Sequence, residues 1–285
     1  MAEAGGTVGG VDLLRFVIAD VFTDVAFAGN QLAVFTDARG IPEERLQPLA
    51  REINFSETVF VYPPADDGHA RMRIFTPVEE LPFAGHPVLG TAFVLGGPLQ
   101  LDELRLETGR GVVPVRLERD GSSIVFGWMT QPPPSIAPFE QTDGLLRALG
   151  VRSELPVELY DNGVPHVYVA LGSEDEVAVL RPDPGRLGEF EVVGVNCFAG
   201  RGRHWKTRMF APGSGVAEDP ATGSAAGPLA LHLARHGRIG FGDEIEIRQG
   251  VEIGRPSTLH AVARSPEEIE VGGSAVVVAR GEFRL

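Results

Sequence analysis

The sequence predicts an α+β fold of two pseudo-symmetric halves, each a curved, mostly antiparallel sheet or barrel wrapped around one central apolar helix. Three observations lead to this prediction. Glycine (36 residues) and proline (22 residues) are abundant among short β-prone segments, which favours short strands and tight turns. Two helical segments are apolar on nearly every side, so each must be surrounded by other structure. An ordered series of motifs also occurs twice, which indicates an internal duplication.

The first half opens with two predicted strands within residues 13–33, joined by a turn at 27–30 (FAGN). Residues 42–53 predict a helix, because a proline suits its first turn and the apolar positions that follow share one face. Asn54 and its neighbours end this helix. The β-rich segment 57–62 (ETVFVY) then predicts a strand.

One apolar helix and several strands complete this half. The helix is predicted at residues 85–95, whose interior carries no polar face. Strands are predicted at residues 71–77, 104–106, 112–117 and 123–128.

The second half follows a linker-like segment at 131–134 (QPPP). Residues 142–149 predict a helix that Gly150 closes. Residues 224–235 predict the second apolar helix, which Pro228 could kink by removing a backbone hydrogen bond.

The duplicated motifs follow the same order in both halves. RIFTP at 73–77 and RMFAP at 208–212 each precede an acidic segment, and a glycine-marked helix start follows at 85–87 (GHP) and 222–224 (TGS). A looser echo of the first turn lies at 162–166 (NGVPH). The repeat of roughly 130 residues is typical of a duplicated supersecondary unit.

We therefore expect an N-terminal half over residues 1–128, to which the extreme C-terminal strand can add, and a C-terminal half over residues 129–285. The cleft between them would receive the N-termini of both apolar helices. Glu57 and His86 would lie on the first side of this cleft and Asp219 on the other.

Charge and cysteine content narrow the possible partners. Asp and Glu (39) outnumber Lys and Arg (25), for a net charge of −14, which argues against nucleic acid or an anionic membrane. Cys197 is the only cysteine, which excludes an intrachain disulfide or a thiolate metal cluster. No apolar run approaches the ~18 residues that span a bilayer. Residues 1–10 lack the features of a secretory signal, so we expect a cytoplasmic protein.

Both predicted helix starts could bind an anionic substrate. A helix N-terminus leaves backbone N–H groups unpaired and carries a partial positive charge. Gly85 and Gly223 would let a ligand approach the backbone closely, and Pro87 needs no partner in a first turn. Two such ends in one cleft would hold a carboxylate, although the glycines equally suit ordinary turns and caps.

Glu57 is the candidate acid or base. It lies between a predicted helix and a predicted strand, with Ser56 and Thr58 beside it and apolar residues beyond. Partial burial would raise its pKa from ~4.3 towards the working range of a general acid or base. The alternative is an exposed glutamate at the start of a strand.

His86, Asp219 and Ser224 are further candidates. His86 and Asp219 lie at matching places in the two halves, where His86 could donate a proton or a hydrogen bond and Asp219 could orient an amine or hydroxyl. Each also suits an ordinary helix start. Ser224 is either a helix cap or a carboxylate ligand through its hydroxyl.

Other kinds of site are disfavoured. His232 and His236 are four residues apart, but no acidic partner completes a metal site of the HExxH type, so we expect them to complement a helix dipole. Neither a Gly-x-Ser-x-Gly elbow nor a nucleotide-binding glycine motif is present. Residues 194–197 and 201–206 are interpreted as turn and surface, and Cys197 is not expected to be a nucleophile.

A set of short motifs runs through nearly the whole chain, from Leu13 to the C-terminus. The motifs are FAGN at 27–30, NFSET at 54–58, FTP at 75–77 through FAGH at 83–86, FAP at 210–212 through EDPATGSA at 218–225, and QG at 249–250 through GRPS at 254–257. Taken in this order, they resemble the phenazine-biosynthesis PhzF-like isomerase family, a branch of the diaminopimelate epimerase fold.

This resemblance implies a pseudo-symmetric, two-domain isomerase that uses no metal or organic cofactor and forms a homodimer. The characterised phenazine enzyme isomerises a dihydro-hydroxyanthranilate by moving a proton between ring carbons. At the matching positions Glu57 would shuttle the proton, with His86 and Asp219 as supporting polar residues. The resemblance assigns substrate binding to Asn30, Gly85, Gly223 and Ser224.

The chain departs from the family pattern at four positions. Gln31 replaces a proline that is common after Gly-Asn, and Pro228 lies inside the second apolar helix. Ala84 and Pro220 occupy places where the epimerase branch carries its paired cysteines, so racemisation by two cysteines is impossible here. A single carboxyl can remove a proton from one face and return it to that face, which favours isomerisation.

The sequence thus favours a cofactor-independent isomerase that moves a proton on a small cyclic or conjugated amino or hydroxy carboxylic acid, with Glu57 as the single acid/base. The alternative is a non-catalytic protein of the same fold that binds a small carboxylate. Hydrolysis through Ser224 or Ser214 is disfavoured because no base is placed by sequence near either serine. The physiological substrate, and a role in phenazine synthesis, stay open.

Overall fold

The computed structural model describes residues 13–190, 192 and 194–284. The expectation for residues 1–10 lies outside the described residues. The first part of the chain contains β1 (Leu13–Val21), β2 (Asn30–Phe35), α1 (Glu43–Ile53), β3 (Glu57–Tyr62), β4 (Ala70–Phe75), β5 (Glu80–Leu81), α2 (Gly85–Leu99), β6 (Glu103–Thr108), β7 (Gly111–Asp120) and β8 (Ser123–Gln131).

The second part of the chain contains β9 (Ser135–Pro138), α3 (Thr142–Leu149), β10 (Glu158–Asp161), β11 (Pro165–Ala170), α4 (Glu174–Val179), α5 (Pro184–Leu187), β12 (Gly194–Arg201), β13 (His204–Ala211), η1 (Pro212–Ser214), β14 (Val216–Asp219), α6 (Gly223–Arg235), β15 (Glu244–Gln249), η2 (Val251–Ile253), β16 (Ser257–Ser265), β17 (Glu268–Gly273) and β18 (Ala275–Arg284).

The strand pairings repeat in the two parts of the chain. β2 pairs parallel with β3, β3 pairs antiparallel with β4, and β4 pairs parallel with β6. The series β11, β12, β13 and β15 repeats these pairings with the same directions. The helix α2 precedes β6, as α6 precedes β15. This repetition confirms the predicted pseudo-symmetric α+β fold.

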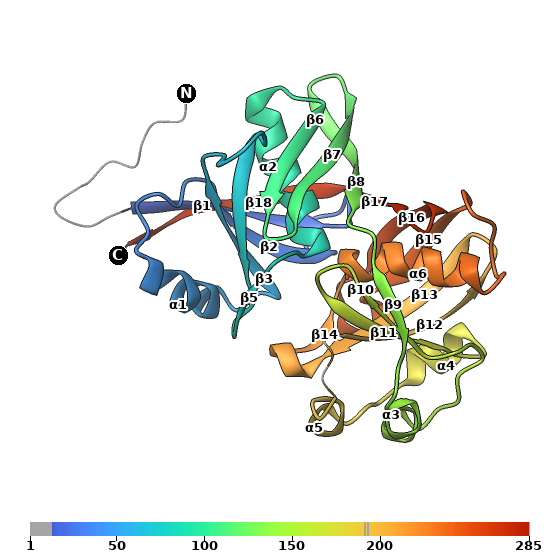
Figure 1. Cartoon of the computed structure of the whole chain (residues 1–285). Coiled ribbons are helices and arrows are strands. Elements are labelled where there is room, and N and C mark those ends of the chain that lie inside the picture. Colours follow the sequence, from blue (N-terminus) through green and yellow to red (C-terminus); the bar gives the residue numbers. More distant parts are fainter. Residues whose placement is uncertain (1–12, 191, 193, 285) are drawn as a thin grey trace.

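The two parts join into one sheet. β8 pairs with β17, and β18 returns to pair with β1, so that all described strands are connected. Four of the pairings among described residues are parallel and the rest are antiparallel. Figure 1 shows one lobe around α2 and a second around α6. The predicted division after residue 128 falls within β8 and stays a prediction.

The core explains the apolar character of α2 and α6. Val88 and Leu89 of α2 belong to the same cluster of buried side chains as Leu229 and Leu233 of α6. Each such side chain contributes roughly 1.5–3 kcal/mol when it is fully buried. Smaller clusters lie under α1 and under α3 to α5. In the described part of the chain, no helix combines the length and the apolar surface needed to cross a bilayer.

Pro228 lies inside α6 without ending it, since the helix continues to Arg235. A proline has no N–H for the carbonyl four residues earlier, which here belongs to Ser224. The side-chain amide of Asn162 donates to that carbonyl over 2.9 Å. A side chain from the loop after β10 thus replaces the missing helical hydrogen bond.

The interpretation of residues 194–197 as turn and surface is wrong, because they belong to β12, which lies between β11 and β13. For residues 201–206 it holds in part, since 202–203 form the turn between β12 and β13 and 201–204 are exposed. The first six residues of β12, including Cys197, are buried. A strand buried on both faces shows no alternation of polar and apolar residues, so its sequence carries no period-two signal.

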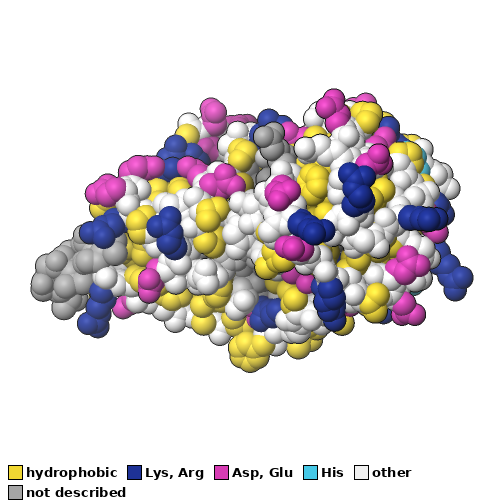
Figure 2. All heavy atoms as spheres, turned by 90° about the horizontal axis from the view of Figure 1, so that it is seen from below, with side chains coloured by type: hydrophobic (Ala, Val, Ile, Leu, Met, Phe, Trp, Pro, Cys, Tyr) yellow, Lys and Arg dark blue, Asp and Glu magenta, His cyan; other side chains and the backbone are white. Residues whose placement is uncertain are grey.

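Charges of both signs are mixed on one face of the molecule (Figure 2). On the face seen in Figure 2, Lys and Arg side chains are separated by Asp, Glu and apolar side chains. Binding to nucleic acid needs a concentration of positive charge. The absence of such a partner stays a prediction.

Candidate functional site

The predicted site residues gather where the N-termini of α2 and α6 meet. A small pocket with a volume of about 30 Å³ is lined by the first residues of both helices, by Glu57 from β3 and by Asp219 from β14. Asn30 lies behind the pocket wall, in contact with Asp219. A wider hollow of about 520 Å³ outside β4 to β7 contains none of the predicted site residues.

Gly85 and Gly223 let the two helix ends touch. A Cβ atom on Gly85 would lie 2.4 Å from the backbone nitrogen of Ser224 and 2.6 Å from the Cα of Gly223. The sequence predicts that these glycines make room for a ligand. The structure shows that they make room for each other's helix, because any side chain there would separate the two N-termini.

Neither of these helix N-termini is capped by a side chain in the described structure. Ala84 and Thr222 occupy the cap positions, but neither side chain accepts a hydrogen bond from the first turn of its helix, and neither first turn contains an acidic residue. The short helices α4 and α5 are capped, by Ser173 and Asp183. The partial positive charges of α2 and α6 therefore stay available to an anion in the pocket.

Asp219 is buried and held by three hydrogen bonds. Ser56 Oγ and Asn30 Nδ2 donate to its Oδ1 over 2.8 and 2.9 Å, and Thr222 Oγ1 donates to its Oδ2 over 2.7 Å. Burial raises the pKa of Asp219 to about 6, although these three bonds act to lower it. At neutral pH the carboxyl therefore keeps its negative charge.

Glu57 is nearly buried, with 15% of its side chain exposed, so it is not the exposed strand-start glutamate of the alternative interpretation. Its Oε2 has no hydrogen-bond partner among the described residues. Burial raises the pKa of Glu57 well above its usual value, and the negative charge of Asp219 raises it further. A carboxyl of this kind is a strong base once ionised and holds a proton firmly once protonated.

His86 faces Glu57, with 3.4 Å between His86 Nε2 and Glu57 Oε2. Burial lowers the pKa of His86 to about 3, although a hydrogen bond with the backbone of Gln31 acts to raise it. The ring is therefore neutral at working pH. Its Nδ1 lies 3.2 Å from Asn30 Nδ2.

The predicted correspondence between His86 and Asp219 is wrong. Gly85 and Gly223 each begin a helix, so the counterpart of His86 is Ser224. Asp219 instead ends β14, four residues before α6. The order of the motifs along the chain suggests the pair His86 and Asp219, whereas the helix starts fix the correspondence in space.

His166 was missed as a site residue. It lines the pocket from β11, and its Nε2 lies 2.9 Å from Ser224 Oγ. The sequence places no base near Ser224, but the structure places this imidazole beside its hydroxyl. The sequence did contain a hint of this residue. Residues 162–166 repeat, loosely, the segment around Asn30 at the start of β2, so a site residue could be expected there. Ser56 and Thr222, the donors to Asp219, lie inside recognised motifs but were given no role.

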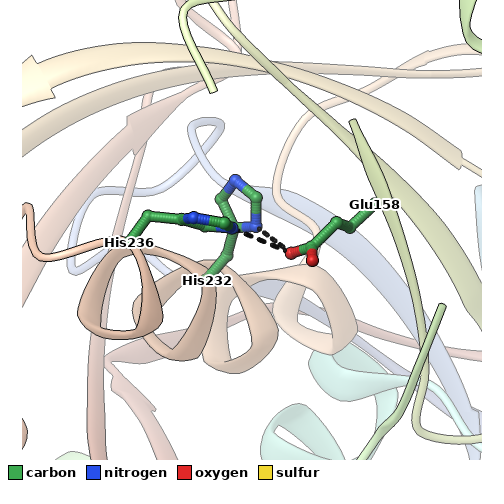
Figure 3. A group of neighbouring side chains, drawn as sticks. All are labelled: Glu158, His232 and His236. Atoms are coloured by element: carbon green, nitrogen blue, oxygen red, sulfur yellow. Dashed lines mark hydrogen bonds and ion pairs between the residues drawn. The ribbon is translucent and has the colours of Figure 1, made fainter. Parts of the chain in front are cut away.

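The His232–His236 pair does have an acidic partner. Figure 3 shows Glu158 pointing from β10 towards both rings on α6, with its Oε2 3.2 Å from His232 Nδ1 and 3.0 Å from His236 Nε2. The three residues could hold a metal by distance alone. Arg235 Nη1, however, lies 2.9 Å from the same oxygen, and a guanidinium there opposes a second cation. We interpret the group as a hydrogen-bonded network.

Known proteins are similar to this chain over nearly its full length. The profile of a family described as phenazine biosynthesis-like protein matches residues 19–281. The trans-2,3-dihydro-3-hydroxyanthranilate isomerase of Pseudomonas aeruginosa is 51% identical over 276 residues, which cover 95% of this chain and 99% of that protein.

Two solved structures share the fold. The phenazine biosynthesis protein of the PhzF family from Bacillus anthracis has a TM-score of 0.82 and 26% identity, covering 95% of this chain and 99% of that one. A hydroxyproline epimerase from Agrobacterium vitis has a TM-score of 0.68 and 15% identity, covering 96% and 93% of the two chains. The second likeness concerns the fold alone.

Proposed function

This chain belongs to the phenazine biosynthesis-like protein family and is an isomerase, and we propose that it moves a proton on a small cyclic, conjugated amino or hydroxy carboxylic acid without a cofactor. The first substrate to test is trans-2,3-dihydro-3-hydroxyanthranilate, which the relative of 51% identity is named for. Its carboxylate would bind at the N-termini of α2 and α6, where both helices lack a side-chain cap.

The proposed reaction uses Glu57 twice. Its carboxylate takes a proton from a ring carbon, and the electron pair of the broken C–H bond enters the conjugated system of the substrate. The carboxylic acid then returns the proton to a different carbon on the same face, so no atom is gained or lost. Neutral His86 and ionised Asp219 would hold the polar groups of the substrate beside this carboxyl.

The observation that carries the proposal is an unpartnered, buried carboxyl in the pocket between two uncapped helix ends. Replacing Glu57 with Gln keeps the shape and removes the base. We expect Glu57→Gln to lower deuterium incorporation from solvent into substrate by about 10²-fold or more, the usual contribution of a general base. Glu52→Gln, an exposed position on α1, is the control and should leave exchange unchanged.

Unchanged exchange in Glu57→Gln would refute the assignment of the base. Binding of the acid without any exchange in the unaltered protein would instead support the alternative, a carboxylate-binding protein of the same fold. A ligand-bound structure then separates the two, because the proposed base must lie within hydrogen-bond reach of an acidic C–H group.

We also propose that the protein works as a cytoplasmic homodimer. The proposal rests on the family resemblance and on a single, buried cysteine, which suits a reducing compartment. Light scattering should give twice the chain mass of 30.5 kDa. A single chain mass at micromolar concentration would contradict the dimer.

A further inference from the structure

We propose that His166 is a positioning residue that fixes the direction of the Ser224 hydroxyl, so that this hydroxyl donates its hydrogen into the pocket towards a substrate carboxylate. The inference rests on the proposed function, since it names how the carboxylate of that substrate is recognised. No covalent step is involved.

The geometry brings the two side chains together inside the pocket. His166 is buried on β11, and Ser224 is buried as the second residue of α6. The distance of 2.9 Å between Nε2 and Oγ is that of a good hydrogen bond. Either atom could donate, so the direction depends on where the imidazole carries its hydrogen.

The surroundings of the other ring nitrogen decide the direction. His166 Nδ1 is buried and has no hydrogen-bond partner in the described structure. It packs against Gly194 of β12, where a Cβ atom would lie 2.6 Å from Nδ1 and 2.8 Å from Met209 Sδ. A buried N–H group without an acceptor is rarer than a buried acceptor without a donor. Nδ1 is therefore the nitrogen without hydrogen, and the imidazole hydrogen lies on Nε2.

The imidazole then donates and never accepts at Ser224. Burial lowers the pKa of His166 to about 3, so the ring stays neutral. Because Ser224 Oγ receives the hydrogen of Nε2, its own hydrogen is free to point to another acceptor. An ionised carboxylate only accepts hydrogen bonds, whereas an ammonium only donates them. The pocket therefore selects an acid at this end.

The same tautomer excludes hydrolysis through Ser224. A serine nucleophile needs a neighbouring base that removes its proton. An imidazole nitrogen that already carries hydrogen and donates it to Oγ cannot do so. His166 and Ser224 lie as close together as the histidine and serine of a catalytic dyad. The direction of their hydrogen bond is the opposite, because here the histidine donates.

The other half of the fold repeats this arrangement. His86 is the second residue of α2, as Ser224 is of α6. Asn30 at the start of β2 contacts His86 over 3.2 Å, and β2 is the topological counterpart of β11. In both halves a side chain on this strand holds the second residue of the helix. Asn30 cannot act as a base, which agrees with a positioning role for both strands.

The test compares binding of 2-aminobenzoate with binding of its neutral amide by calorimetry, which needs no turnover. His166→Met removes the donor at similar size, and His166→Gln restores an N–H group. We expect His166→Met to weaken the acid about 10-fold or more, as for a hydrogen bond to a charged group, and to leave the amide nearly unchanged. His166→Gln should recover most of the loss.

A double-mutant cycle separates positioning from general damage. In the Ser224→Ala background, His166→Met should add no further loss for the acid. Equal losses for acid and amide, or a full additional loss without the serine, would overturn the proposal. Steady-state kinetics of the isomerisation should likewise show a rise in KM that exceeds the fall in kcat.

The tautomer can be measured without any ligand, by ¹⁵N resonances of the unaltered protein with labelled histidine. We expect a bare Nδ1 and a protonated Nε2 at His166. A protonated Nδ1, or labelling of Ser224 by a fluorophosphonate, would refute the inference even if isomerase activity were present. Both measurements can be made even if the protein shows no isomerase activity, so they test this inference separately from the proposed function.

Discussion

The two carboxyls of the pocket differ in their hydrogen bonds. Asp219 accepts from three donors, which stabilise its ionised form. Glu57 has an unpartnered oxygen at 3.4 Å from a neutral imidazole. Two nearby carboxyls cannot both ionise easily, so Asp219 ionises first and Glu57 loses its proton only at higher pH.

Replacing Asp219 with Asn tests this division of charge. The raised pKa of Glu57 is caused first by burial and then by the charge of Asp219. Because Glu57 must be ionised to act as a base, kcat/KM should rise with pH through the apparent pKa of the pair. Without the neighbouring charge that pKa falls, so Asp219→Asn should move the rising limb to lower pH.

The measurement is the pH dependence of kcat/KM. The pH at which kcat/KM rises is compared between Asp219→Asn and the unaltered protein, and the maximal value of kcat/KM is not. The exposed Glu282→Gln is the control and should keep the limb in place. A limb that stays or moves to higher pH in Asp219→Asn would show that Asp219 does not raise the pKa of Glu57.

Among the elements, α2 offers a matched pair of glycines. A Cβ on Gly85 would overlap the first turn of α6, whereas a Cβ on Gly97 meets nothing within 4 Å. Gly85→Ala should lower the free energy of unfolding by about 1–3 kcal/mol through overpacking. Gly97→Ala should change it by less than about 1 kcal/mol, because the helix propensity of alanine favours the fold while a Cβ directly before Pro98 opposes it.

Urea denaturation of the two variants checks this prediction. Gly85→Ala should also lose most of its isomerase activity, since the helix N-termini would separate, and Gly97→Ala should keep it. Equal stability in the two variants would mean that the contact between α2 and α6 is not tight in solution.

The Glu158 network ties the end of α6 to β10. Burial acts to raise the pKa of Glu158, but hydrogen bonds from His236, Tyr160 and Arg235 lower it to about 2. A lowered pKa in the folded state stabilises the protein above the ordinary value of 4.5, and this stabilisation is lost as the pH falls towards 2. Glu158→Gln should therefore be less stable at pH 7, by roughly 1–3 kcal/mol.

Unfolding midpoints between pH 7 and pH 3 check this linkage. The difference in unfolding midpoint between Glu158→Gln and the unaltered protein should become smaller below pH 4.5. Glu154→Gln is the control, because Glu154 is half exposed and its pair with Arg238 is 3.5 Å long. A constant difference over the whole range would exclude ionised Glu158 as the source of stability.

At the scale of the whole molecule, the C-terminal strand β18 belongs to the lobe that the N-terminal strand opens. It pairs with β1 from Leu13 to Val21, on the side that β2 leaves free. Deleting residues 275–285 should raise amide exchange in β1 and β2 by about 10-fold or more, because local stability falls with the lost ladder.

Hydrogen exchange by mass spectrometry measures this effect, and the α6 lobe is the internal control. Exchange in β11, β12 and β13 should stay close to that of the full chain. Equal loss of protection in both lobes would show that they unfold as one cooperative unit.

Much of the fold and part of the site follow from the sequence. The duplicated motifs and the two apolar helices predict the pseudo-symmetric α+β architecture, since periodicity and order are properties of the chain itself. The motifs also identified Glu57, His86 and Asp219, because each lies inside a short segment that carries its own signal. Their roles as base and supporting groups stay predictions.

Other features were decided only by the tertiary structure. The contact between His166 and Ser224 joins residues 58 positions apart, and that between Glu158 and His232 joins residues 74 apart. Such pairs depend on which strand lies against which helix, and no local pattern encodes this. The strand β12 could not be predicted for a related reason. Its neighbours bury it on both faces, so its sequence shows no alternation of polar and apolar residues.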